Sequence, residues 1–482
     1  MGDFVSQGTI DDGLMPVPDA LGHDATALAL LHKAVFLPPG SVLAIQGSWG
    51  RGKTDVLTRI ATRVRDPEKH GLPKGLVADA LWINPWQYGT PDLLTPLVLA
   101  MLARIPEEPR RNDKRLRKIA ETLLRAGLNF GLKAAGSAVP ILGLATDPVD
   151  KMVSGLFDAA GMKGETDNPD PDPVSVMGER FRELAQKLLE AKGDQPDARL
   201  LICVDDLDRC LPDRQVALLE AIRFLISSGA PVTFLIALDP TLARQAIITH
   251  YHTDAFDPDR YLDKMFDLRV NLPSLGMRIQ DLVKHHLDRE MHALGHVMKI
   301  GDAVRDLLSQ NASALLQEAA VTALSTPDLA NPRVVRRIFD RLYLLAVSRA
   351  SAKMRPLFLS NAREHGQLLL WLGITERFPA IRAAVQAAAG KESFTQRLTV
   401  IHRAYTFDQS VASATSLTPS SDGESQTPGL KSPFEAVLAL YRLPTPSSAP
   451  DLGSVFAYLH SKDGNWADRI REIDDALVLA GL

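Results

Sequence analysis

The chain has 482 residues, of which 45% are hydrophobic and 23% are charged, and its formal net charge is −4. This balance is typical of globular proteins, and it excludes a collagen-like chain, a chain disordered throughout and a multi-span membrane protein. The 54 Lys and Arg residues are balanced by 58 Asp and Glu residues, so any contact with nucleic acid would need a local basic patch.

The cysteines and the N-terminus indicate the cellular compartment. Cys203 and Cys210 are the two cysteines, and they have no second pair or nearby histidine that would complete a disulfide framework or a zinc site. Residues 1–15 carry three aspartates and lack the basic and apolar regions of a secretory signal. We therefore expect a cytoplasmic protein.

Five short apolar runs predict strands of a parallel sheet that is buried on both faces. Apolar residues recur at helical spacing from Val216 to Ile226, between the third and fourth runs, and predict a strand-helix-strand unit. The predicted fold class is therefore α/β, with a parallel sheet of about five strands. The five runs are residues 42–45, 81–83, 200–204, 233–238 and 268–272.

The segment between the second and third predicted strands is too long for a plain crossover, and we expect an inserted helical subdomain at residues 101–175. Residues 110–118 hold six basic side chains in nine positions, and residues 134–145 are uncharged. The uncharged run is well below the roughly 20 residues that span a bilayer, so we expect no membrane span. The basic run predicts a solvated helical face; peripheral membrane contact and phosphate-backbone contact remain as alternatives.

Beyond Pro273 the strand patterns give way to helical ones. We expect the sheet domain to comprise residues 1–100 and 176–275, with the insertion between them, and a helical lid to follow at residues 276–405. Residues 406–433 are rich in Ser, Thr, Pro and Gly and predict a flexible linker. Residues 434–482 are predicted to be a small helical tail.

A phosphate loop directly follows the first predicted strand and matches G-x-x-x-x-G-K-[ST] at every fixed position. Its backbone N–H groups are predicted to surround the β-phosphate, while Lys53 reaches the β- and γ-phosphates and the Thr54 hydroxyl ligates Mg²⁺. The glycine spacing excludes the dinucleotide fingerprint, and the absence of an Asn-Lys-x-Asp signature favours ATP over GTP. The predicted nucleotide-binding residues are Gly47, Ser48, Trp49, Gly50, Arg51, Gly52, Lys53, Thr54 and Asp55.

Two adjacent aspartates end the third predicted strand, at the sheet edge where ligands of open α/β sheets bind. Asp205 is the predicted outer partner of Mg²⁺, and Asp206 is the predicted base that orients the attacking water. Asp208 and Arg209 follow them, and here an internal ion pair and a role near the nucleotide both remain open.

Together these motifs resemble the KAP family of P-loop NTPases, from about residue 19 to about residue 390. The resemblance implies an additional-strand P-loop NTPase, in which one strand separates the Asp205 strand from the Lys53 strand. Many bacterial members carry transmembrane segments in the insertion, some soluble relatives act in defence against phage, and animal members are membrane scaffolds. The matching stretches are residues 49–54, 84–86, 205–210, 239–240, 261–264, 331–333 and 377–379.

Two further site residues come from this resemblance. Asp239, after the fourth strand, is expected to sense the γ-phosphate, with an Asp-Pro turn or helix cap as the alternative. Arg333 opens a helix of the lid, with Arg337 one turn on, and is expected to reach the γ-phosphate; the alternative is a solvated helical arginine. Trp86 and Tyr88 are predicted to pack, with base stacking as the alternative.

The sequence therefore predicts a cytoplasmic Mg²⁺-dependent ATPase whose nucleotide cycle drives conformational change in a multi-component complex, with a role in anti-phage defence implied by the resemblance alone. Its ligands would be ATP and Mg²⁺, its partners other proteins, and a homo-oligomer remains open. Two alternatives stay: a nucleotide-binding scaffold or signalling protein with little turnover, peripheral at a membrane, and a nucleic-acid-stimulated motor.

Overall fold

The structure of the chain is a computed structural model, which divides into two compact units, Met1–Pro273 and Ser274–Leu482. Tyr88, most of the uncharged run and most of the predicted linker lie outside the described residues. The residues that the structure describes are 19–73, 75–87, 94–134, 156, 176–193, 197–252, 257–273, 278–295, 310–325, 329–351, 362–387, 393–406, 438, 442–444, 452–460 and 465–482.

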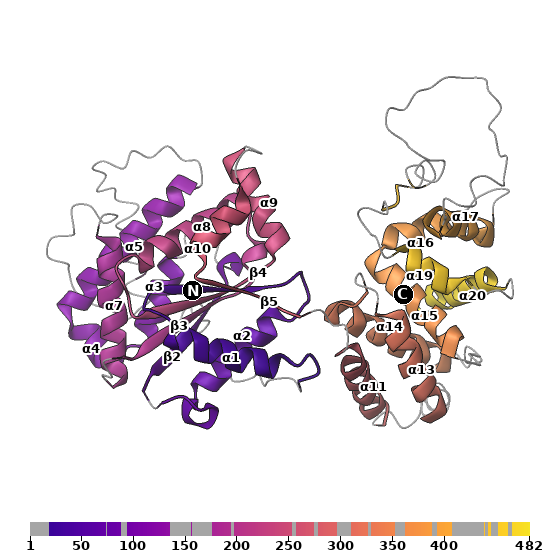
Figure 1. The fold of residues 1–482 in the computed structure, drawn as a ribbon, viewed down its shortest axis with the longest axis horizontal. Coiled ribbons are helices and arrows are strands. Elements are labelled where there is room, and N and C mark those ends of the chain that lie inside the picture. Colours follow the sequence, from indigo (N-terminus) through magenta and orange to yellow (C-terminus); the bar gives the residue numbers. More distant parts are fainter. Residues whose placement is uncertain are drawn as a thin grey trace, which may run out of the picture. The chain divides into compact units, whose positions relative to one another are not determined.

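The first unit is built on a sheet of five parallel strands in the order β2-β3-β4-β1-β5 (Figure 1). All five predicted strands are present, and β4 lies between β1 and β3, as the family resemblance implies. This order places the strand ending in Asp205 two positions from the strand that leads into the phosphate loop. The bounds are β1 Ser41–Gln46, β2 Val77–Ile83, β3 Arg199–Val204, β4 Val232–Leu238 and β5 Leu268–Asn271.

Helices cover both faces of this sheet, so its central strands are apolar on both sides. Every residue of β1 and β4 is buried, and alternate side chains of β1 enter two different core clusters. One face is covered by α1 (His23–Phe36) and α2 (Lys53–Val64). The other face packs against α3 (Leu94–Ala103), α5 (Lys114–Ala134), α7 (Met177–Lys192), α8 (Pro212–Ile226), α9 (Pro240–Tyr251) and α10 (Pro258–Met265).

The described start of the predicted insertion belongs to this helical layer. Buried residues of α5, among them Leu116 and Leu123, share one core cluster with the strands and with α7. The short helix α4 (Glu107–Asn112) precedes α5. The described start of the insertion is therefore helical and packs within the first unit. Residues 135–155 and 157–175 lie outside the described part, and the inserted subdomain stays a prediction.

The basic run at the start of α5 contacts α7 through two ion pairs. Lys187 Nζ of α7 lies 3.2 Å from Oδ2 of Asp113, the acid of the run, and Arg115, which is 71% exposed, lies 3.5 Å from Glu183 of α7. Such exposed pairs contribute little stability. What the basic side chains of the run bind stays a prediction. Among the described helices, none is long and apolar enough to cross a membrane.

The second unit is helical throughout its described residues. Most of its helices pack against α15 (Ala362–Arg377), whose Trp371 is among the largest fully buried side chains. The lid role predicted for this unit stays a prediction. The helices are α11 (Ile279–Gly295), α13 (Gln310–Ala323), α14 (Pro332–Ser351), α15 (Ala362–Arg377), α16 (Pro379–Gln386), α17 (Phe394–Thr406), α19 (Leu452–Leu459) and α20 (Trp466–Leu479).

The predicted tail is part of the second unit rather than a separate body. Helices α19 and α20 pack against α15 and α17, and the Asp474 carboxylate of α20 is 3% exposed. It accepts hydrogen bonds from Trp371 Nε1 at 3.0 Å, Arg382 Nε at 2.8 Å and Gln386 Nε2 at 2.7 Å. The apolar stripe of α20 (Ile470, Ile473 and Leu477) is buried, and the described parts of the predicted tail and the predicted lid fall in one compact unit.

We expect Asp474→Ala to lower the free energy of unfolding of the second unit by about 3 kcal/mol, because it leaves the nearly buried Arg382 charge without its partner. The matched control is Asp475→Ala, since Asp475 is exposed on the same helix, and its effect should stay within about 0.5 kcal/mol. Urea unfolding of the full chain measures both. Equal effects of the two substitutions would show that the Asp474 network is not structural.

Candidate active site

The phosphate loop connects the carboxyl end of β1 to the first residue of α2. Gly50 and Gly52 have φ angles of 85° and 87°, in the left-handed region that glycine adopts without a Cβ penalty. The backbone N–H of Gly47 donates to Leu238 O of β4 at 3.2 Å, and Arg51 N–H donates to Ser48 O at 3.2 Å. These contacts tie the start of the loop to the sheet and curl the rest toward the N-terminus of α2.

Lys53 is the first residue of α2, and its side chain folds back across the loop. It is 8% exposed, and Nζ donates to Gly47 O at 2.9 Å. Nζ also lies 3.3 Å from Asp208 Oδ2, and this carboxylate is only 6% exposed. The Lys53 ammonium is therefore held inside the loop, paired with an acid whose role the sequence left open between an ion pair and a position near the nucleotide. The structure shows an ion pair, with Lys53 as the partner of Asp208, and a role near the nucleotide stays a prediction.

Thr54 and Asp205 lie together although they come from different elements. Asp205 follows β3, its N–H donates to Ile83 O at 3.0 Å, and the Thr54 side chain hydrogen-bonds to its carboxylate. Burial raises the pKa of the Asp205 carboxyl, and the Thr54 hydrogen bond offsets part of that rise. A buried carboxylate beside a hydroxyl is an oxygen donor pair that a hard cation would stabilise.

These residues fit Mg²⁺ better than a transition metal. Within the described parts of the chain no group of three or more His, Cys, Asp or Glu side chains is arranged to hold a metal ion. Mg²⁺ is usually bound through one or two protein ligands, with water and substrate phosphates supplying the rest. Thr54 and Asp205 would be those two ligands.

Asp206 is held by contacts to both of its carboxylate oxygens. Its φ angle of 55° lies in the left-handed region, which is strained for a residue other than glycine. Oδ1 accepts a hydrogen bond from Arg209 Nε at 2.9 Å, and Oδ2 accepts one from Trp86 Nε1 at 3.1 Å. The orientation of the predicted base is therefore fixed by two residues for which the sequence had assigned no such role.

Arg209 is stacked between two tryptophan rings. Its guanidinium carbon lies 4.9 Å from the centroid of Trp86 and 5.7 Å from that of Trp49, a residue of the phosphate loop. A cation over an aromatic face at this distance gains about 0.5–1 kcal/mol at an exposed site. Trp86 was predicted to pack; it is instead 42% exposed and bonded to Asp206.

Comparison with known proteins agrees with this geometry. Residues 25–348, more than half of the chain, match the model of the KAP family P-loop domain. The chain belongs to the KAP family of P-loop NTPases. A curated relative, the phage T7 exclusion protein of Escherichia coli (strain K12), is 23% identical over 280 residues, which cover 56% of this chain and 35% of the relative. This chain thus covers about a third of that relative's length.

Two other residues predicted for the KAP site have structural partners. Asp239 caps α9, since its Oδ1 accepts hydrogen bonds from the backbone of Thr241 at 2.9 Å and Leu242 at 3.5 Å. That is the helix-cap alternative, and γ-phosphate sensing by Asp239 stays a prediction. The Asp55 carboxylate lies 2.9 Å from His23 Nδ1 of α1 and accepts from Arg59 Nε at 2.9 Å. Asp55 therefore joins α2 to α1, and its predicted nucleotide contact is untested.

Arg333 belongs to the second unit of this KAP NTPase. Its backbone N–H donates to Asn331 Oδ1 at 3.0 Å, so Asn331 caps α14, and the Arg333 side chain is exposed. Arg337, one turn on, pairs with Glu376 of α15. The position of Arg333 relative to the phosphate loop stays a prediction, because the two units are described separately.

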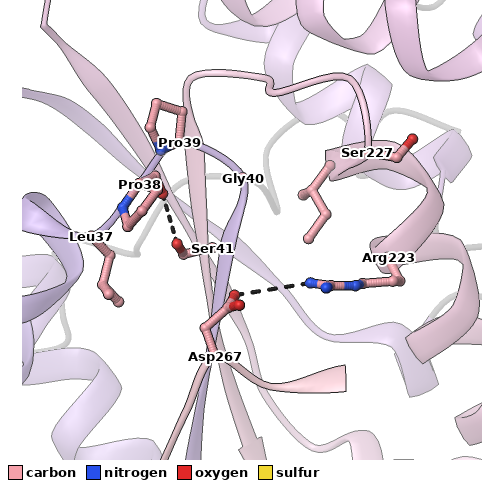
Figure 2. Close-up of a pocket in the computed structure, with 9 residues that line it drawn as sticks. Leu37, Pro38, Pro39, Gly40, Ser41, Arg223, Ser227 and Asp267 are labelled. Carbon is pink, nitrogen blue, oxygen red and sulfur yellow. Dashed lines mark hydrogen bonds and ion pairs between the residues drawn. The ribbon is translucent and has the colours of Figure 1, made fainter. Parts of the chain in front are cut away.

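A cavity of about 410 Å³ lies at the opposite end of β1 from the phosphate loop (Figure 2). The Ser41 hydroxyl, at the start of β1, donates to Pro38 O at 2.7 Å, and Arg223 lies 4.0 Å from Asp267 across the cavity. Because ligands of open α/β sheets bind at the carboxyl ends of the strands, this cavity is not part of the nucleotide site.

We expect Gly52→Ala to destabilise the first unit by roughly 2–3 kcal/mol, because a methyl group would be strained at φ 87° and would collide with the His23 ring. His23 is 3% exposed and held by Asp55, so it has little room to move. Gly71→Ala is the matched control: Gly71 has φ 75°, but its nearest neighbour would be 3.7 Å away, so the cost should be about 1 kcal/mol. His23→Ala added to Gly52→Ala should recover part of the loss in urea unfolding; no recovery would contradict the collision.

Proposed function

We propose that this KAP NTPase is a Mg²⁺-dependent ATPase whose nucleotide cycle changes the conformation of the chain and of a partner complex. The observation that supports it most is the meeting of Lys53, Thr54, Asp205 and Asp206 at the carboxyl edge of β1 and β3. Two segments far apart in the sequence supply the groups that phosphoryl transfer needs. A nucleotide-binding role alone would not need a positioned Asp206.

Each residue has one task in this proposal. The backbone of the phosphate loop binds the phosphates, and Lys53 leaves Asp208 to meet the β- and γ-phosphates. Thr54 and Asp205 would hold Mg²⁺, which would neutralise charge on the phosphate oxygens. Asp206 orients a water and accepts its proton as the water oxygen bonds to the γ-phosphorus; the bond to the bridging oxygen breaks and ADP leaves.

Limited proteolysis of the full chain tests the conformational part. We expect the cleavage pattern with a slowly hydrolysed ATP analogue and Mg²⁺ to differ from the pattern with ADP, and we expect Lys53→Ala to give one pattern under both conditions. Identical patterns for the wild-type chain in both nucleotide states would contradict a nucleotide-driven change, whatever its turnover.

We also propose a cytoplasmic protein that acts in defence against phage, supported by the name of the relative, phage T7 exclusion protein. Plating efficiency tests this in bacteria that express the chain together with its neighbouring genes. The wild-type locus should reduce plaque numbers and Lys53→Ala should restore them. Equal plaque numbers for both would contradict a role for the nucleotide site in exclusion.

A further inference from the structure

Three stretches that lie far apart in the sequence meet beside the phosphate loop. Trp49 comes from the loop, Trp86 from the turn η2 (Pro85–Gln87) after β2, and Arg209 from the turn η3 (Leu207–Arg209) after β3. The Arg209 guanidinium lies between the two indole rings. We call this group the Trp–Arg–Trp stack (Trp49, Arg209, Trp86).

The stack holds Asp206 on two sides. Arg209 Nε donates to Oδ1 of Asp206, and the Trp86 indole N–H donates to Oδ2. A planar guanidinium can lie flat against two rings and still direct an in-plane N–H at a carboxylate, which a lysine ammonium cannot do. The stack therefore fixes the direction of the Asp206 carboxylate as well as its distance.

The turn η3 is connected to the phosphate loop at two points. Asp208 pairs with Lys53, and Arg209 stacks on Trp49, so two consecutive residues of the turn contact loop residues. A phosphate that takes Lys53 away from Asp208 would free one connection, and a loop that closes around phosphates would displace Trp49. Asp206 lies at the start of this turn and would follow both changes.

We propose that Arg209 is a positioning residue for Asp206. Through its contact with Trp49, the position of Arg209, and with it the orientation of Asp206, depends on whether phosphates occupy the loop. The proposal deepens the ATPase function above and rests on it for the effect on turnover. Trp86 is the fixed side of the stack, because it has no place in the loop and is joined to the loop through Arg209. Arg209 itself needs no contact with the nucleotide.

Kinetics with ATP and Mg²⁺ test the positioning role. We expect Arg209→Ala to lower kcat at least tenfold while the Kd for ATP stays within about threefold of wild type. Arg209→Lys keeps the charge but cannot stack and bond together, so its kcat should stay at least fivefold low. Trp86→Phe keeps a ring beneath Arg209 and removes the indole donor, and it should lower kcat with unchanged Kd even where Arg209→Ala fails to fold. The control Trp82→Phe alters a tryptophan whose indole N–H donates to Asn84, outside the stack, and should behave as wild type.

Tryptophan emission tests the link to the loop without requiring hydrolysis. ATP is added to the wild-type chain and to Trp86→Phe, and the change in tryptophan emission is measured for each. The difference between the two changes is the share that comes from Trp86. This share should fall at least by half when both chains also carry Arg209→Lys, because the stacked guanidinium is one of the two contacts, beside Asp206, through which Trp86 senses the loop. A share that Arg209→Lys leaves unchanged would overturn the proposal. A kcat of Arg209→Ala within twofold of wild type would also overturn it, and so would a loss of ATP binding by Arg209→Ala together with the loss of kcat. A wild-type chain that binds ATP without turnover would refute the ATPase function instead, and the emission result would still decide the link.

Discussion

Lys53→Ala is expected to weaken ATP binding at least about 100-fold, equivalent to roughly 2.8 kcal/mol. The substitution removes the ammonium that donates to Gly47 O at the start of the loop. It also leaves the nearly buried Asp208 carboxylate facing the predicted position of the phosphates. Both effects oppose an anionic ligand: one deletes an attraction and the other exposes a repulsion. Titration calorimetry with ATP and Mg²⁺ measures the loss.

Two variants isolate the cause of that loss. Lys69→Ala is the matched control, since Lys69 is exposed in the short 3-10 helix η1 (Pro67–His70) that follows α2 and pairs with Asp66, and its ATP affinity should equal that of wild type. Lys53→Ala should also lower the free energy of unfolding, because the Asp208 carboxylate loses its ion pair. Adding Asp208→Asn should recover part of that free energy of unfolding but only a small part of the ATP affinity. ATP affinity of Lys53→Ala within twofold of wild type would refute the assignment of the loop.

Asp206→Asn is expected to lower kcat at least 100-fold and to leave ATP affinity within about threefold. An amide cannot accept the proton of the attacking water, and its single oxygen can accept a hydrogen bond from Arg209 or from Trp86 but not from both, since they bond to different oxygens of Asp206. The base is therefore lost, while one of the two hydrogen bonds that hold the side chain is kept. Phosphate release and ATP titration on the same preparation separate the two effects.

The control for this substitution is Asp213→Asn. Asp213 lies in the first turn of α8, is exposed, and pairs with His250, so the change removes one acidic charge without touching the site. Its kcat should match wild type. A near wild-type kcat for Asp206→Asn would place the base at another residue.

The sheet could be predicted because its signals are local. A parallel strand buried on both faces needs a short continuous apolar run, and each of the five runs became a strand. The second run was predicted too short, at residues 81–83, because Asp79 interrupts the apolar pattern of β2. The Asp79 carboxylate is held by Arg104, just after α3, and by Lys192 of α7, which lets an acid occupy a strand that is otherwise apolar.

The phosphate loop could be predicted for the same reason. Its residues are contiguous, and the spacing of the glycines, Lys53 and Thr54 identifies the motif. The partners of the loop are not local. Lys53 meets Asp208 and Trp49 meets Arg209 because β3 lies two strands from β1, an order that no single segment of sequence encodes. Sequence reasoning could name the members of the site but could not show which of them touch.

The same limit explains the predicted tail. Its apolar stripe was visible in the sequence, yet its partner α15 lies about a hundred residues earlier, as the hydrogen bond from Trp371 to Asp474 shows. A Ser/Thr-rich segment between them suggested separation. Contacts across such a distance come from packing, and composition carries no trace of them.

The central claim is that the meeting of Lys53, Asp205 and Asp206 makes this chain an ATP hydrolase. Phosphate release by the purified full chain in excess ATP and Mg²⁺ tests it most directly, measured beside Asp206→Asn and again after Mg²⁺ is removed with EDTA. The account predicts more than one phosphate released per wild-type chain, with release lost in Asp206→Asn and on removal of Mg²⁺. Equal release by the wild-type and Asp206→Asn chains, or release that EDTA leaves unchanged, would contradict it.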